Sequence, residues 1–326
     1  KEKQPDQWQR LVELIEERNP NNIGINISED FAIADGLVHT DYEALKESLP
    51  KQLEDKLISA EKLAIAWIET RTEKEMELYN TLVSVTHDII DEAFSEKVIK
   101  PGVTTTDDVV WFLRQKVTDM GLETWFHPTV DVQRSEEALK SHIESFSKAK
   151  EKTIILPGDL LHCDFGISYI TLNTDCQQHA YVLKEGESEV PQYLQEAFEK
   201  GNRLQDILTS NFEEGKTGNE ILLASLQQAK SEGLQPSIYT HPLGTYGHSA
   251  GPTIGMWDSQ GGVPGTGDYP LYENTVYAIE LNTTVTIPEW KKDIRIMLEE
   301  AGFYGTNGFR YVNGRQKAIK PIKVEK

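Results

Sequence analysis

Cysteine, long apolar runs and positive charge are all scarce in this 326-residue chain. Two cysteines are too few for the disulfide framework of a small secreted domain. No segment approaches the roughly 18 to 20 consecutive apolar residues of a membrane-spanning helix. The net charge of −20 disfavours nucleic acids and anionic membranes as partners, because both bind positive surfaces. Since 38% of the residues are hydrophobic, the chain can bury a sizeable core, and we expect a globular protein.

The first residues show no export signal of the usual kind, in which basic residues precede an apolar segment. The chain begins with Lys1 rather than Met. We therefore expect a cytoplasmic protein, and an exported or periplasmic protein whose signal has been removed is the alternative.

Residues 1–70 predict part of a small α/β domain, and residues 71–326 predict a larger second domain. Apolar residues at helical spacing from Trp8 to Ile15 indicate a helix. Strands are expected over 23–27 and 56–60, with a helix over 41–49 between them, an order that favours parallel pairing. Two strands are too few for a stable sheet, so this segment either leans on the larger domain or is the remnant of a longer one.

The larger domain contains two capping boxes, Thr72 with Glu75 and Thr217 with Glu220. They predict the start of helices that run to about residues 94 and 233. Further helices are expected over 105–121 and after Pro191, and a strand over 125–130. A polar loop over 134–152 leads into the most informative stretch of the chain.

Residues 158–183 predict two strands with an aspartate inside each, Asp164 and Asp175. Strands avoid aspartate, and a carboxylate on a packed face is costly unless a cation meets it. If the strands pair with Asp164 opposite Asp175, both side chains share one face of the sheet. Divalent metal ions would remove the resulting repulsion. The alternative is that both aspartates cap turns beside Asn173 and Gly166.

The same register would set Cys163 opposite Cys176, on the other face of the ribbon. We expect two buried thiols that behave as small apolar residues. A cross-strand disulfide is the alternative.

Three further candidates for metal ligands follow. Glu280 lies in the middle of an apolar strand, where a glutamate is almost never buried without a partner. In the strand after Asp293, alternation places Glu299 rather than Glu300 toward a site, because Ile294, Ile296 and Leu298 form the face that packs on helices. A salt bridge, for instance with Arg295, is the alternative for both glutamates.

His248 lies among small residues between Gly247 and Gly251, which allow close approach of a substrate. Four carboxylates and one histidine form an oxygen-rich set with one nitrogen, which suits Mn²⁺, Co²⁺, Fe²⁺ or Zn²⁺. Four negative charges would balance two divalent ions.

These residues resemble the pita-bread metallopeptidases, family M24, which includes methionine aminopeptidase, Xaa-Pro aminopeptidase, prolidase and creatinase. The resemblance covers about residues 72–310. It matches the family's ligand order Asp, Asp, His, Glu, Glu with the metal ligands Asp164, Asp175, His248, Glu280 and Glu299. It implies an α+β pita-bread fold with a partial N-terminal α/β segment, two divalent metal ions and a homodimer.

The resemblance has one clear departure. The family carries a second histidine about seven residues after the ligand histidine, where it holds the substrate and the developing oxyanion, and this chain has Gly255 there. His241, His162 and His179 are candidate replacements, each with a structural role as the alternative. An upstream proton-shuttling histidine would be His127 or His142.

The function implied by the resemblance is a dinuclear metal-dependent peptidase of the Xaa-Pro aminopeptidase or prolidase kind. A hydroxide bridging the ions would attack the peptide carbonyl, Glu280 would transfer the proton, and His241 or His162 would steady the oxyanion. One alternative is a hydrolase or lyase of the same fold that acts on a small zwitterion, and another is a non-catalytic binding protein.

Overall fold

The structure, a computed structural model, describes residues 6–137 and 152–323. Contacts divide the chain into two units, residues 1–68 and 69–326. The expected division placed this boundary between residues 70 and 71.

From residue 6 on, the first unit contains a short parallel strand pair and four α-helices. Strand β1 (Ile23–Ile25) pairs in parallel with β2 (Leu57–Ser59), as predicted. The carboxylate of Asp6 caps the first helix by accepting hydrogen bonds from two backbone amides of its first turn. The helices are α1 (Gln7–Arg18), α2 (His39–Ser48), α3 (Lys51–Glu54) and α4 (Glu61–Glu69). Their small core consists of Ile25, Leu45, Leu49 and Leu53.

In its described residues, the second unit contains two pairs of α-helices and a set of mostly antiparallel strands. The helices are α5 (Glu73–Ala93), α6 (Thr106–Asp119), α8 (Gln192–Ser210) and α9 (Gly218–Ser231). The strands of its first half are β3 (Thr129–Gln133), β4 (Leu160–Phe165), β5 (Ser168–Tyr169), β6 (Leu172–Asn173) and β7 (Cys176–Val182). Those of its second half are β8 (Gln235–Ile238), β9 (His241–Leu243), β10 (Thr275–Ala278), β11 (Leu281–Ile287), β12 (Lys292–Leu298), β13 (Ala301–Gly305), β14 (Gly308–Tyr311) and β15 (Lys320–Ile322). This mixture confirms the predicted α+β class.

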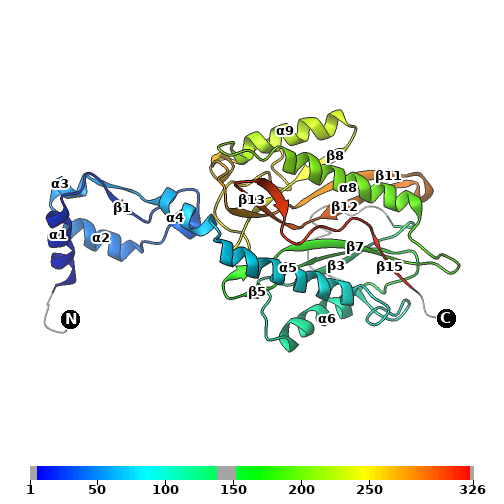
Figure 1. The fold of residues 1–326 in the computed structure, drawn as a ribbon. Coiled ribbons are helices and arrows are strands. Elements are labelled where there is room, and N and C mark those ends of the chain that lie inside the picture. Colours follow the sequence, from blue (N-terminus) through cyan, green and yellow to red (C-terminus); the bar gives the residue numbers. More distant parts are fainter. Residues whose placement is uncertain (1–5, 138–151, 324–326) are drawn as a thin grey trace. The chain divides into compact units, whose positions relative to one another are not determined.

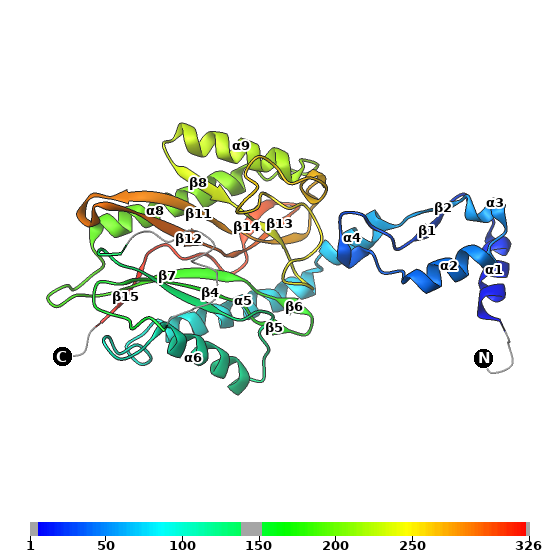
Figure 2. The ribbon, with the colours of Figure 1, turned by 180° about the vertical axis from the view of Figure 1, so that it is seen from behind.

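The sheets of the second unit lie between the two helix pairs (Figures 1 and 2). One sheet has the strand order β15-β7-β4-β3 and contacts α5 and α6, and another has the order β12-β11-β8 and contacts α8 and α9. A third sheet has the order β14-β13-β10-β9. Strands β7 and β12 also contact each other, so polar residues on the facing sides of the first two sheets meet inside the protein.

The helix starts follow from the predicted capping boxes. Thr72 with Glu75 begins α5 and Thr217 with Glu220 begins α9, and each threonine hydroxyl accepts from the glutamate's backbone amide while the glutamate carboxylate accepts from the threonine amide. The apolar face of β12 packs on a helix, as predicted. There Gly201 of α8 lets the backbone approach Ile296 so closely that an added Cβ would lie 2.7 Å from its Cγ2 atom.

Strand β3 begins later than predicted. The expected strand over 125–130 is observed at 129–133, because Pro128 has no amide hydrogen for a ladder. Trp125 instead donates its indole N–H to the backbone oxygen of Thr174 at 2.8 Å. Most of the expected loop over 134–152 lies outside the described residues. Among the described helices, none combines the length and the apolar character of a membrane-spanning segment.

Candidate metal centre

Three neighbouring strands pass from one sheet to another at the same level. Between β8 and β9, between β10 and β11, and between β12 and β13 the ladder is interrupted for two residues, and the strands before and after each break pair in different sheets. The breaks are bonded to one another, since Tyr239 N donates to Glu280 O at 3.2 Å and Ile279 N donates to Glu300 O at 2.9 Å. Glu280 and Glu299 lie in these breaks rather than within strands as predicted, and His241 follows the first break.

The aspartate ribbon forms, but the predicted register is wrong. Asp164 of β4 pairs with Gln177 of β7, and Asp175 lies two residues earlier, just before the strand begins. A separate small hairpin, β5 with β6, occupies the connection and shifts the pairing. Because residues two apart share a face, Asp164 and Asp175 are diagonal neighbours on one face of the ribbon.

The cysteines are not directly opposite either, since Cys163 pairs with Gln178. Both cysteines are buried free thiols, as predicted, and the disulfide alternative is not formed.

His241 faces the carboxylates. Its Nε2 atom lies 3.5 Å from Glu299 Oε1, 3.8 Å from Asp175 Oδ2 and 3.9 Å from Glu280 Oε2. We call Asp164, Asp175, His241, Glu280 and Glu299 the carboxylate cluster. Four of its buried atoms have no hydrogen-bond partner: Asp164 Oδ1, Asp175 Oδ1, Glu299 Oε1 and His241 Nε2. Buried polar atoms are almost always satisfied, so these unpaired oxygens around an imidazole nitrogen fit a divalent cation.

Burial and mutual repulsion keep protons on the carboxylate cluster when no cation is present. Burial raises the pKa of Asp164 to about 6. Burial, followed by the charge of Glu299, raises the pKa of Asp175 and of Glu280 well above the usual values. Burial and the charge of Asp164 do the same to the pKa of Glu299. Burial lowers the pKa of His241 to about 4, so this ring is neutral near pH 7 and offers a lone pair to a metal.

A chain of hydrogen-bonded polar residues, Asp131, His162 and Gln177, supports Glu280 and Glu299. The Gln177 side chain donates from Nε2 to Glu280 Oε1 at 2.5 Å and to Glu299 Oε2 at 3.0 Å. Its Oε1 atom lies 3.0 Å from Nε2 of His162, whose Nδ1 lies 3.0 Å from Asp131 Oδ2. Burial lowers the pKa of His162, but the charge and hydrogen bond of Asp131 outweigh burial, and the net pKa is raised.

Gln177 and Asp131 were not anticipated from the sequence. The period-two pattern could have identified Gln177, because it lies two residues after Asp175 and therefore faces the same side. Asp131 is opposite His162 in the β3–β4 ladder, a pairing that depends on the displaced start of β3.

The other predicted histidines lie in different surroundings. His248 is exposed and stacks edge-on against His241, with 4.4 Å between ring centroids. Repulsion from the His241 ring in its protonated form, followed by partial burial of the His248 ring, lowers the pKa of His248 to about 4. His179 is buried and bonded to backbone atoms of Leu161 and Met297, and His127 lies 2.8 Å from Arg114 Nη1. His142 lies outside the described residues.

Gly255, at the position of the family's second histidine, has no space for a side chain. Its φ is +77°, and an added Cβ would lie 2.2 Å from the backbone oxygen of Ile238. The backbone at this position therefore requires glycine, which agrees with the absence of the family's second histidine from the sequence.

A sequence model of metallopeptidase family M24 matches residues 77–302. The match covers more than half of the chain, and the chain belongs to this family of metallopeptidases, which are hydrolases. No curated protein sequence matches the chain.

Solved structures share the fold. An X-Pro aminopeptidase from Thermotoga maritima is 16% identical, with a TM-score of 0.66 over 98% of this chain and 80% of its own. An Xaa-Pro dipeptidase from Bacillus anthracis is 19% identical, with a TM-score of 0.61 over 96% of this chain and 78% of its own. A prolidase from Pyrococcus furiosus is 17% identical, with a TM-score of 0.58 over 95% of this chain and 80% of its own. These likenesses confirm the pita-bread fold.

Proposed function

We propose that this chain is a dinuclear metal-dependent peptidase that cleaves short peptides with proline after the residue whose carbonyl is attacked. The observation that carries the proposal is the carboxylate cluster with its four unpaired buried atoms. Family membership supplies the reaction class, and the named aminopeptidase and prolidases of the same fold support proline peptides as the first substrates to examine.

The ligands in this proposal are Asp164, Asp175, His241, Glu280 and Glu299. His241 replaces His248, the ligand expected from the sequence, because its Nε2 atom lies near three of the carboxylates. Four carboxylates balance the charge of two divalent ions, whereas one ion would leave a strongly anionic pocket. Bound divalent ions acidify a coordinated water and polarise a peptide carbonyl. We take manganese as the first metal to test, since oxygen-rich sites suit it.

The exposed fractions of the side chains indicate which residues can contact the substrate. The Glu280 side chain is 15% exposed, against 6% for Asp175 and 1% for Glu299, which supports Glu280 as the group that exchanges a proton with the substrate. The exposed His248 ring lies beside His241 and can donate a hydrogen bond to a substrate oxygen. It would thereby replace the family's second histidine, whose position is occupied by Gly255. His162 acts through Gln177 as a positioning residue.

Peptide hydrolysis with paired variants tests the proposal. Asp175→Asn and Glu299→Gln keep the side-chain shape but remove a negative ligand. Both should abolish manganese-dependent cleavage of the Xaa–Pro bond, measured as release of the N-terminal residue from Xaa-Pro dipeptides and from longer peptides that begin with Xaa-Pro. Glu232→Gln, an exposed glutamate in a surface ion pair with Arg203, is the matched control and should retain full activity. Unchanged hydrolysis by both cluster variants would refute the site.

The same assay tests the alternative function suggested by the missing second histidine, a hydrolase or lyase that acts on a small zwitterion. Creatine-like and sulfonium zwitterions are offered beside the peptides, and turnover of these compounds alone would replace the peptidase proposal by a hydrolase or lyase. Metal bound without any turnover would point to a binding protein. A homodimer and a cytoplasmic location stay predictions, the first of which light scattering checks.

A further inference from the structure

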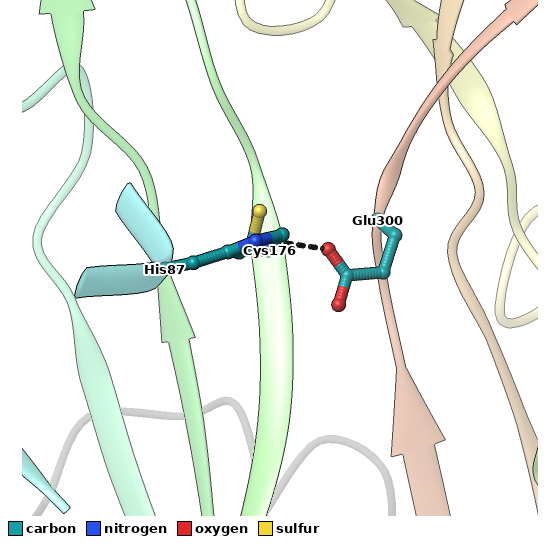
Figure 3. A group of neighbouring side chains, drawn as sticks. All are labelled: His87, Cys176 and Glu300. Carbon is teal, nitrogen blue, oxygen red and sulfur yellow. Dashed lines mark hydrogen bonds and ion pairs between the residues drawn. The ribbon is translucent and has the colours of Figure 1, made fainter. Parts of the chain in front are cut away.

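A second group of potential metal ligands lies outside the carboxylate cluster. It consists of His87 on α5, Cys176 at the start of β7, and Glu300 in the break between β12 and β13, and we call it the rear cluster (Figure 3). Figure 3 shows the His87 ring pointing from its helix toward the other two side chains. Residues distant in sequence thus bring a sulfur, a nitrogen and an oxygen to one place.

The rear cluster is distinct from the carboxylate cluster although the two share strands. Cys176 lies between Asp175 and Gln177, and Glu300 follows Glu299. Successive side chains of extended backbone point to opposite faces. The same two strand segments therefore present oxygen ligands on one side and a mixed set on the other.

The geometry of the rear cluster suits one small cation. Its ligand atoms all lie within 4.8 Å of one another, and His87 Nε2 is 2.6 Å from Glu300 Oε2. The other oxygen, Glu300 Oε1, accepts from Gln178 Nε2 at 3.1 Å and from the Gln316 backbone amide at 3.0 Å. These two donors fix the carboxylate and leave Oε2 directed at the imidazole, as outer-shell partners do at metal sites.

Solvent reaches the rear cluster from one side. Cys176 and Glu300 are buried, whereas the His87 side chain is 19% exposed. His87 and Gln178 border a cavity of about 400 Å³ that is also lined by Gln316 and Lys320. An ion can enter from this cavity and keep a water molecule on that side.

We propose that the rear cluster binds a single thiophilic divalent ion, of the Zn²⁺ type, through Cys176 Sγ, His87 Nε2 and Glu300 Oε2. Thiolate, imidazole and carboxylate are all ordinary zinc ligands, and three protein ligands with one open position are a common arrangement. One thiolate and one carboxylate neutralise the two positive charges. When the ion binds, the Cys176 thiol gives its proton to solvent, and bonds to the ion replace the hydrogen bond between His87 and Glu300.

Cobalt spectroscopy tests this assignment without any use of peptidase activity. Metal-stripped protein is titrated with Co²⁺, and the near-ultraviolet absorption of thiolate-to-cobalt charge transfer is followed. The carboxylate cluster contains no sulfur, so this band reports the rear cluster alone. The band should rise to the intensity of one cobalt ion per chain in the wild type and in Cys163→Ser, the matched control for the other buried thiol.

Two variants decide the outcome. Cys176→Ser should lose the band completely, and His87→Gln, at the accessible edge, should weaken Co²⁺ binding at this site by about 10-fold or more. Far-ultraviolet circular dichroism establishes that each variant is folded, and His87→Gln remains informative if Cys176→Ser is not. A wild type that binds Co²⁺ without the band, or a band that persists in Cys176→Ser, would show that the rear cluster is only a hydrogen-bonded pair beside a thiol.

Discussion

Replacement of Gln177 by leucine should weaken metal binding at the carboxylate cluster. The Gln177 amide group donates to Glu280 and Glu299 together, and both hydrogen bonds lower the pKa values of these glutamates. Without them the carboxylates hold their protons more tightly, so an incoming ion has to displace them at a greater cost. The hydrogen bond between His162 Nε2 and Gln177 Oε1 is also lost.

The expected magnitude follows from the bonds removed. Each hydrogen bond to a charged acceptor contributes about 1.5–3 kcal/mol. Only part of this free energy affects metal binding. Loss of a hydrogen-bond partner of a metal ligand usually lowers metal affinity by about 10- to 100-fold, or about 1.4–2.7 kcal/mol. We expect a decrease in Mn²⁺ affinity within this range for Gln177→Leu.

Isothermal titration calorimetry of the metal-stripped protein with Mn²⁺ measures the effect. Gln178→Leu is the matched control, because the next residue of β7 has the same side chain on the opposite face, bonded to Glu300. Its Mn²⁺ affinity at the carboxylate cluster should be that of the wild type. Equal affinities for Gln177→Leu and the wild type would show that Gln177 does not support the ligands.

Three further predictions concern His241, Glu69 and Gly201. His241→Ala should lower Mn²⁺ affinity much more than His248→Ala in the same titration, and the reverse order would return the ligand role to His248. Burial raises the pKa of Glu69 to about 8, so the folded state keeps a proton that the unfolded state loses above its pKa of about 4.5. The free energy of unfolding should therefore fall as the pH rises from about 4.5 to about 8, by at most about 1.4 kcal/mol per pH unit from this group. Denaturant unfolding of Glu69→Gln at several pH values should show a flatter dependence, and a slope equal to that of the wild type would contradict this. Gly201→Ala should destabilise the fold by about 1–3 kcal/mol because the new methyl group meets Ile296 and Leu298, whereas Gly261→Ala, in open space, should leave the thermal midpoint unchanged.

The sequence predicted helices better than it predicted strand pairing. Capping boxes and apolar spacing are local signals, and they located the starts of α5 and α9 correctly. The register of β4 against β7 depends on how the chain between them folds, and the β5–β6 hairpin there moved Asp164 from Asp175 to Gln177. A pattern of single residues does not contain that information.

The candidate site shows the same division. The four carboxylates of the proposed site could be named because a buried carboxylate is costly wherever it occurs. The histidine that lies beside these carboxylates could not be predicted, because the chain changes sheet at residues 239 and 240 and this change brings His241 to them. The same breaks placed Glu280 outside any strand, although its neighbours suggested one continuous apolar strand.

Glu299 and Glu300 lie where the chain changes sheet between β12 and β13, so the register of β12 determines the cluster that each glutamate joins. Leu298 of β12 lies opposite Leu281 of β11, and this pairing sets which of the next two glutamates turns to each side. A slip of one residue would exchange the faces to which the two side chains point, turning Glu299 toward the side of His87 and Glu300 toward the side of Asp175. A single deletion within β12 would therefore disturb both clusters at once, although it removes no ligand from either.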